Sequence, residues 1–188
     1  MDELKEKKGE EKNKAPAMSF VKIIRNYCIM VAAVMLLTTI LFHTILFNAY
    51  IPTESMEDTL MTGDRAVGLR LSYKTKDPER GDVVIFLFPD DKNTYFIKRI
   101  IGLPGDTVEI KDGKVYVNGE ILDEPYLKEE MEKEEYMKFE VPDDSYFVLG
   151  DNRNSSYDAR YWENTYVPKE DIQAKALFKY YKGFKIIK

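Results

Sequence analysis

The sequence predicts a mainly β protein, with one N-terminal transmembrane helix followed by an all-β domain that carries a small inserted segment of strands and helix. About 21 consecutive residues, 27–47, lack a charge, and short runs rich in Val, Ile, Phe and Tyr recur between turn residues after them. At 188 residues the chain has room for one membrane segment and one domain of roughly 130 residues. We therefore expect a tail over 1–20, an anchor over 21–48 and a β-rich domain over 49–188.

Residues 1–20 are rich in Lys and Glu and poor in large apolar side chains, so we expect them to be disordered. As a helix, the uncharged run is roughly 32 Å long, about the thickness of the bilayer hydrocarbon. A cleaved secretory signal is the alternative. The run is longer than the roughly 7 to 15 residues typical of a signal core, and bulky Phe47 stands two positions before the nearest small residue, Ala49.

The charges beside the anchor predict its orientation. Lys22 and Arg25 precede it, whereas Glu54, Glu57 and Asp58 follow it closely. Because positive charge is retained on the cytoplasmic side, we expect a single pass with the N-terminus in the cytoplasm and the domain outside.

The β domain is predicted from short runs of strand-forming residues between turn signals. The expected strands are 66–73, 82–88, 94–101, 107–111, 114–117, 146–149 and 174–181. Asp112-Gly113 predicts a tight hairpin, and Asn118-Gly119 predicts the start of another, because these pairs tolerate positive φ. Residues 127–137 are dense in Glu and Lys and are expected to be helical, within a surface insertion over about 111–145.

The scarcity of histidine and cysteine excludes several kinds of site. His43 and Cys28 are the only residues of their types, and both lie inside the uncharged run. A Ser-His-Asp triad, a Cys-His dyad or a His/Cys zinc site in the domain is therefore excluded. The net charge of −5 also argues against nucleic-acid binding, which depends on basic residues.

A hydrolase without a usable histidine needs a lysine or a carboxylate as its base, and Ser55 with Lys98 is one candidate pair. Ser55 lies in a loop after Pro52, and Lys98 shares a predicted strand face with Phe96 and Ile100. An apolar setting favours the neutral amine, which can accept a serine proton. Spacing alone leaves the alternatives open, since a strand lysine usually faces solvent and a serine in such a loop usually makes a turn.

Four segments together resemble the bacterial type I signal peptidases, in matching order and approximate spacing. They are Pro52-Thr-Glu-Ser55-Met56-Glu-Asp-Thr59-Leu60; Gly81-Asp82-Val83-Val84; Lys98-Arg99-Ile-Ile-Gly102-Leu-Pro104-Gly105-Asp106; and Gly150-Asp151-Asn152-Arg153-Asn-Ser155-Ser156-Tyr-Asp158-Ala-Arg160. The resemblance covers nearly the whole domain. It implies a catalytic domain of coiled, barrel-like antiparallel sheets on the outer face of the bacterial cytoplasmic membrane.

The resemblance also implies roles for individual residues. Ser55 is the expected nucleophile, Lys98 its general base and Thr53 an oxyanion-hole donor with the backbone N–H of Ser55. Ser156 is expected to orient Lys98, with a supporting salt bridge between Asp158 and Arg160. The expected substrate contacts are Ile51, Pro52, Met56 and Ile97. From its turn-forming residues alone, the 150–160 loop also fits a simple turn-rich connection.

The implied activity is signal peptidase I: a membrane-bound serine endopeptidase that cleaves exported preproteins after a small residue, of Ala-x-Ala type, through an acyl-enzyme. Its expected partners are preproteins and the lipid bilayer, with no cofactor, no metal and no nucleic acid. The alternatives are a conjugation-type or organellar Ser-Lys processing peptidase, a self-cleaving regulator, and a catalytically silent, membrane-tethered β binding domain. Two positions depart from the family pattern: Asp58 replaces the usual Pro, and Ala159 the usual Ser. The acidic stretch 124–140 has no role by resemblance.

Overall fold

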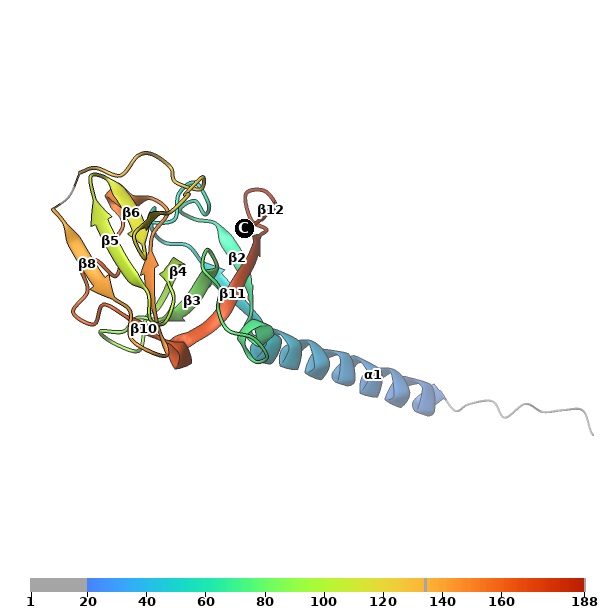
Figure 1. Ribbon diagram of the computed structural model, residues 1–188. Coiled ribbons are helices and arrows are strands. Elements are labelled where there is room, and N and C mark those ends of the chain that lie inside the picture. Colours follow the sequence, from blue (N-terminus) through green and yellow to red (C-terminus); the bar gives the residue numbers. More distant parts are fainter. Residues whose placement is uncertain (1–19, 134, 188) are drawn as a thin grey trace, which may run out of the picture. The chain divides into compact units, whose positions relative to one another are not determined.

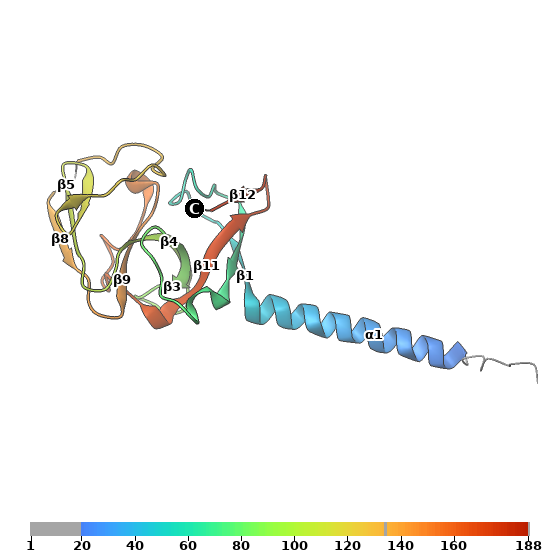
Figure 2. The same ribbon diagram turned by 45° about the vertical axis from the view of Figure 1, so that its right-hand side comes forward.

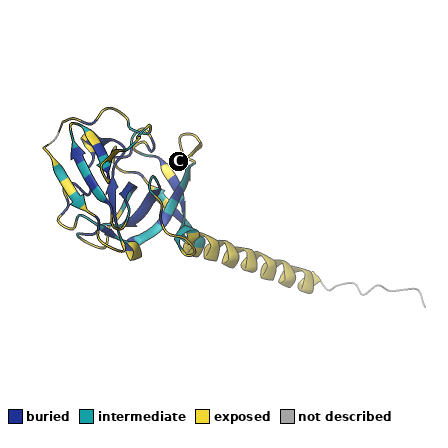
Figure 3. Ribbon diagram, viewed as in Figure 1, coloured by how far each residue is buried: buried dark blue, intermediate teal, exposed yellow. Residues whose placement is uncertain are grey.

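A computed structural model describes residues 20–133 and 135–187 (Figure 1), so the expected tail lies almost wholly outside the described residues. Helix α1 (Phe20–Ile40) continues as a π-helical turn, η1 (Leu41–Ile45). The side chains of α1 are exposed all around (Figure 3). The 26 residues Phe20–Ile45 are long and apolar enough to cross a membrane, and an 18-residue stretch within them has a mean hydropathy of 2.3.

The helix ends three residues before the predicted boundary at residue 48. Residues Leu46–Tyr50 form strand β1, which pairs antiparallel with β2 (Arg65–Leu69) from Leu46 opposite Leu69 to Tyr50 opposite Arg65. The strand is itself apolar at its start. An uncharged run therefore does not reveal where the helix gives way to the strand.

Residues from Leu41 onward form a second unit, built from β-strands and short helical turns. Its remaining elements are η2 (Arg70–Tyr73), β3 (Val83–Leu87), β4 (Tyr95–Gly102), β5 (Thr107–Lys111), β6 (Lys114–Val117), β7 (Glu120–Ile121), β8 (Met137–Glu140), β9 (Ser145–Leu149), η3 (Arg153–Ser155), β10 (Val167–Pro168), η4 (Lys169–Asp171), β11 (Ile172–Lys179) and β12 (Lys185–Ile186). Each predicted strand overlaps one of these, but the predicted strand 66–73 ends at Leu69, and Arg70–Tyr73 form the helical turn η2 instead.

Within the described residues, the strands form two antiparallel sheets. The larger has the order β1-β2-β11-β3-β4-β9-β10, with β12 added to β11, and the smaller has the order β7-β6-β5-β8. Figures 1 and 2 show β5 and β8 on the opposite side of the domain from β11 and β12. The mainly β prediction with antiparallel sheets is confirmed.

The inserted segment contains the predicted hairpin but not the predicted helix. Asp112 and Gly113 have φ of 52° and 72°, as the tight turn between β5 and β6 requires. Residues 127–133, 135 and 136 are irregular, and β8 begins at Met137. The helix prediction was wrong because it rested on Glu and Lys content. Asn154 instead holds this segment through side-chain bonds to the Glu130 carbonyl and the Glu132 N–H.

The core links both sheets and fixes the strand that carries Lys98. Buried residues from β3, β4, β5 and β9 form one cluster with Trp162; among them are Phe86, Ile100, Val108 and Phe147, each 0% exposed. Because β4 is packed on this cluster and paired with β3 and β9, its side chains are held in fixed directions.

The hairpin turn generates a stability prediction. Any residue that replaces Gly113 must keep the positive φ of the turn, which disfavours residues with a Cβ. An added Cβ would also lie 2.5 Å from the Met131 carbonyl oxygen. We expect Gly113→Ala to reduce the free energy of unfolding by about 3 kcal/mol, the sum of the backbone and overpacking penalties. Urea unfolding of the full chain in detergent, followed by fluorescence of Trp162, the single tryptophan, measures this.

Gly119→Ala is the matched control. Gly119 has φ of 86° but nothing within 4 Å of its Cβ position, so only the backbone penalty, about 1 kcal/mol, is expected. Equal losses for the two variants would contradict a tight contact between the hairpin and Met131.

Candidate active site

Ser55 lies in the loop between β1 and β2, whose shape is set by apolar anchors and backbone bonds. Ile51, Met56 and Leu60 are at most 1% exposed and pack together in the core. The Ile51 N–H donates to the Asp64 carbonyl at 3.0 Å, which closes the loop, and Leu60 N–H donates to the Met56 carbonyl at 2.7 Å. Ser55 is thereby held in a fixed place, with only 6% of its surface exposed.

Lys98 projects from β4 directly onto Ser55. Its Nζ lies 2.5 Å from Ser55 Oγ, across 43 residues of sequence. Lys98 is 4% exposed, and burial lowers the pKa of its amine from 10.5 to about 8, against the opposite influence of Asp158 and Asp151. The sequence-based expectation of a desolvated amine on this strand face is confirmed. An amine with this pKa can act as a base near neutral pH.

Thr53 places a second hydroxyl group next to that of Ser55. Its Oγ1 lies 3.3 Å from Ser55 Oγ. The two side chains come from the same loop, two residues apart, and share one side of it. Any group that approaches the Ser55 hydroxyl from this side of the loop would therefore lie close to the Thr53 hydroxyl as well.

The loop over residues 150–160 supports Ser55 from behind. Asn152 N–H donates to the Ser55 carbonyl at 3.1 Å, and Asn152 Nδ2 donates to the Glu54 carbonyl at 3.2 Å. A Cβ on Gly150 would lie 2.4 Å from the Ser55 carbonyl oxygen, so only glycine permits this close approach. The segment is thus more than a turn-rich connection.

Asp158 and Arg160 form the salt bridge that the resemblance implies. Arg160 Nε donates to Asp158 Oδ1 at 2.8 Å, and Asp158 Oδ2 accepts from the Gly150 N–H at 3.0 Å. Both side chains are 0% exposed. The pair therefore fixes the start of the supporting loop.

The structure places Ser156 beside the site but not in a hydrogen bond with Lys98. Ser156 Oγ is buried and has no hydrogen-bond partner among the residues that the structure describes. It lies against Gly150, where a Cβ would approach it to 2.2 Å. Its expected role in orienting Lys98 is a proposal that these contacts do not test.

Sequence reasoning missed a buried network on the other face of β4. Arg99 donates to both oxygens of Asp151, at 2.8 and 2.6 Å, and to the Gly81 carbonyl at 2.7 Å. Thr59, four residues after Ser55, donates to Asp151 at 2.5 Å. The sequence did contain an indication of this network, because Arg99 and Asp151 both lie in the segments that resemble the family. Local patterns, however, do not pair residues that are 52 positions apart.

An apolar hollow of about 630 Å³ opens over Ser55 and Lys98. Its walls come from β1, the Ser55 loop, β3, β4 and the supporting loop, and include Phe47, Ala49, Pro52, Ile85, Tyr95, Phe96, Ile97 and Tyr157. Of the four residues expected to contact substrate, Pro52 and Ile97 line this hollow. Ile51 and Met56 do not, because they are packed in the core and are 1% and 0% exposed.

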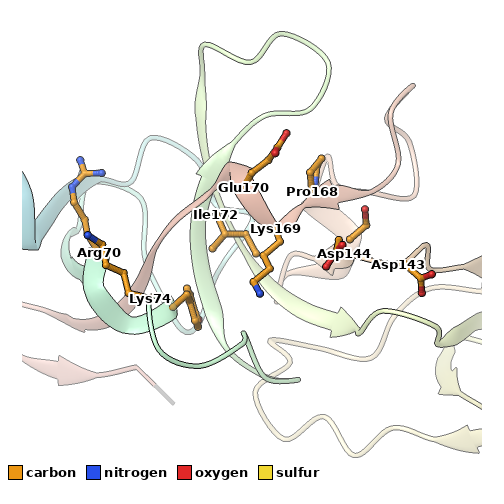
Figure 4. A pocket seen from close by; sticks show the side chains of 10 residues that line it. Arg70, Lys74, Asp143, Asp144, Pro168, Lys169, Glu170 and Ile172 are labelled. Atoms are coloured by element: carbon orange, nitrogen blue, oxygen red, sulfur yellow. The ribbon is translucent and has the colours of Figure 1, made fainter.

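A second hollow, of about 700 Å³, lies beside η2 and η4 (Figure 4). Charged side chains of both signs line it, with Arg70 and Asp143 at opposite ends. It shares no lining residue with the hollow over Ser55 and Lys98. Within residues 20–133 and 135–187, no group of three His, Cys, Asp or Glu side chains is placed to hold a metal ion.

Comparison with known proteins gives matches along most of the chain. The family model described as "Signal peptidase, peptidase S26" matches residues 21–181. A probable signal peptidase I-2 of Synechocystis is 49% identical over 137 residues, which cover 70% of this chain and 62% of the relative. Signal peptidase I P of Bacillus subtilis subsp. natto is 36% identical over 161 residues, covering 80% and 82%.

Among solved structures, a crystal structure of a signal peptidase I from Enterococcus faecalis matches with a TM-score of 0.47 and 34% identity. The match covers 53% of this chain and 97% of that one. The aligned part of this chain spans less than two thirds of the Synechocystis relative, at 62% of its length.

The buried amine predicts an unusual stability effect. Below pH 8 both the folded and the unfolded chain bind the Lys98 proton, and the folded state bears the full desolvation cost. The lowering of the pKa from 10.5 to about 8 corresponds to about 3 kcal/mol. As pH rises from 8 to 10.5, only the unfolded chain stays protonated, and the cost disappears. We expect Lys98→Met to stabilise the protein by up to about 3 kcal/mol at pH 6.5 and by almost nothing at pH 10.5.

Urea unfolding of the full chain in detergent at both pH values measures the effect. Lys114→Met, at an exposed position on β6, is the control and is expected to change stability by less than about 0.5 kcal/mol. A Lys98→Met variant that is less stable at both pH values would contradict a desolvated Lys98.

Proposed function

The chain belongs to the signal peptidase family, peptidase S26, and we propose that it is a signal peptidase I. In this proposal it is a membrane-bound serine endopeptidase that cleaves signal peptides from exported preproteins after a small residue. Ser55 is the nucleophile and Lys98 the general base, and the reaction proceeds through an acyl-enzyme.

The 2.5 Å contact between Lys98 Nζ and Ser55 Oγ carries this proposal. Burial favours the neutral amine, and the same burial removes water that would otherwise compete for the amine's lone pair. In the active form, the Ser55 hydroxyl donates its hydrogen bond to this lone pair. The proton is therefore already aligned for transfer when a substrate arrives.

In the first half-reaction, Ser55 Oγ attacks the scissile carbonyl carbon as Lys98 takes the hydroxyl proton. The oxyanion is stabilised by the Thr53 hydroxyl and the Ser55 backbone N–H, as donors of this kind typically contribute about 3 to 4 kcal/mol each. When the tetrahedral intermediate collapses, the C–N bond breaks and the Lys98 ammonium protonates the leaving amine. The products are an ester on Ser55 and the new N-terminus of the mature protein.

In the second half-reaction, a water molecule attacks the ester carbonyl and gives a proton to the neutral Lys98. Collapse of this intermediate breaks the bond to Ser55 Oγ, which recovers its proton from Lys98. The signal peptide leaves with a new carboxylate. One buried amine serves as base and acid in both halves.

The hollow over the dyad fits an extended apolar peptide with small side chains. Its walls from Pro52, Ile85 and Ile97 are aliphatic, and Phe96 and Tyr157 add aromatic rings to the lining. Bulky residues next to the scissile bond would have to displace packed side chains, which favours a small residue there. These wall residues are our proposed substrate contacts.

The helix Phe20–Ile45 is the proposed membrane anchor. Lys22 and Arg25 at its N-terminal end favour a cytoplasmic N-terminus, with the peptidase domain on the extracytoplasmic face. Preproteins presented by the same membrane would then reach Ser55 from the side on which signal peptides are released.

The direct test uses the full chain in lipid vesicles with a preprotein that carries small residues before its cleavage site. We expect cleavage after the small residue, identified by the new N-terminus. Ser55→Ala should abolish it, and Lys98→Ala should lower its rate by at least about 10³-fold, because the base is lost. Ser72→Ala and Lys114→Ala, outside the site, should cleave normally.

A preprotein with leucine in place of the small residue should remain intact. If the unaltered chain cleaves no preprotein, the peptidase proposal fails in favour of a membrane-tethered binding domain. Full activity of Lys98→Ala would instead exclude the dyad while keeping the protease.

The lowered pKa of Lys98 also predicts the pH dependence. Only the neutral amine accepts the serine proton, so kcat/KM should rise with pH through a midpoint near 8, with roughly a tenth of the molecules active at pH 7. The measurement is the initial cleavage rate between pH 6 and 10.5 at low substrate concentration. A midpoint near 10.4, that of a free lysine, would refute a desolvated base.

A further inference from the structure

Within the acidic insertion, residues 122–131 form a short segment that is partly exposed but turns the side chains of Glu124 and Tyr126 inward, toward Arg153 and Arg99. We propose that Glu124 and Tyr126 of this segment are positioning residues of the active site: they hold the guanidinium groups of Arg153 and Arg99, and thereby fix the loop that supports Ser55. This inference rests on the proposed peptidase function.

Glu124 neutralises an arginine that is otherwise enclosed by protein. Arg153 NH1 and NH2 donate to the two Glu124 carboxylate oxygens at 3.1 and 2.5 Å, in a forked pair. The two side chains are only 1% and 7% exposed. A buried guanidinium needs such a partner, because water cannot replace it. Glu124 therefore determines where Arg153 can lie.

Arg153 in turn fixes the backbone that touches Ser55. Its Nε donates to the Gly150 carbonyl at 2.9 Å, and its own carbonyl accepts from Arg160 NH2 at 2.7 Å. Gly150 lies directly against the Ser55 carbonyl, and Asn152 N–H bonds that same carbonyl at 3.1 Å. The Glu124 carboxylate thus reaches the nucleophile through one side chain and one turn of backbone.

Tyr126 makes the second contact, to the network on the back of β4. Its ring stacks on the Arg99 guanidinium, with Arg99 Cζ 3.9 Å from the ring centroid. Its hydroxyl donates to Glu124 Oε1 at 2.8 Å. Burial raises the pKa of the phenol, so it remains protonated and keeps this donor. Tyr126 therefore couples the two arginine pairs, Arg99–Asp151 and Arg153–Glu124.

Three further contacts hold the segment across the site. Lys128 Nζ donates to Glu57 at 3.0 Å, in the loop that carries Ser55. Asn154 of the supporting loop bonds the Glu130 carbonyl at 3.1 Å. Arg160 NH1 contacts the buried Met131 sulfur at 3.7 Å. The segment thus touches both loops that meet at the dyad.

The test compares Glu124→Gln with the unaltered full chain in the preprotein assay. The amide keeps the shape and one acceptor but loses the charge. We expect kcat to fall roughly 10- to 100-fold while KM changes less than about threefold, because small displacements of catalytic groups slow the chemical step more than they weaken binding. Rates are normalised to folded protein by Trp162 fluorescence and circular dichroism, so that a loss of folded molecules does not lower kcat.

Glu130→Gln, the same change at an exposed position of the same segment, is the matched control and should leave kcat unchanged. Tyr126→Phe is the second variant. It keeps the ring on Arg99 but removes the donor to Glu124, and it should lower kcat at least threefold with the fold intact.

The inference is overturned if folded Glu124→Gln retains kcat within threefold. If Glu124→Gln does not fold, Tyr126→Phe decides: a kcat lowered less than threefold overturns the inference and leaves the segment a role in folding alone. Absence of cleavage by both the unaltered chain and Glu130→Gln would mark the failure of the proposed function, and of this inference with it.

Discussion

The burial of the Lys98 amine is the constraint on which the arrangement of the surrounding charges depends. Its amine has a pKa of about 8 because burial disfavours the ammonium, yet Asp158 and Asp151 both act to raise that pKa. Each of these carboxylates is paired with a buried arginine, Arg160 and Arg99. The pairs therefore do more than fix the supporting loop. The Arg160 guanidinium also lowers the pKa of Lys98, which offsets part of the opposite effect of Asp158 and Asp151.

Strand β4 connects the two halves of this arrangement. Lys98 and Arg99 are neighbours, so the alternation of a strand sends one side chain to Ser55 under the apolar hollow and the other to Asp151 behind it. The pairing of β4 with β3, Lys98 opposite Val84 and Arg99 opposite Val83, fixes this assignment. A slip of one residue would exchange the two faces and bury the permanent charge of arginine beside Ser55.

The sequence predicts the features that depend on local patterns, and misses those that depend on distant partners. The hairpin at Asp112-Gly113 and the direction of Lys98 follow from turn chemistry and alternation. Strand β1 could not be recognised because it continues the uncharged run of the helix. The helix expected over 127–137 was wrong because the prediction rested on Glu and Lys content, whereas the conformation of this segment is set by contacts with distant residues such as Asn154. Ile51 and Met56, which the resemblance suggests as substrate contacts, are buried in the core beneath the Ser55 loop, and their burial depends on tertiary packing that local patterns do not reveal. The pairs Arg99–Asp151 and Arg153–Glu124 span 52 and 29 residues, distances over which local patterns carry no information.

The acidic insertion shows why charge density alone does not separate a solvated surface from a working part of the site. Glu129, Glu130 and Glu132 are exposed, as a solvated surface predicts, but the Glu124 side chain is only 7% exposed and faces an arginine that is 1% exposed. A carboxylate is buried at such a position only when a specific partner offsets its desolvation. The insertion therefore combines a soluble exterior with an inward contact, and that contact reaches the same loop that the Asp158–Arg160 pair supports. Two ion pairs, Asp158–Arg160 within the loop and Glu124–Arg153 from outside it, therefore converge on the backbone behind Ser55.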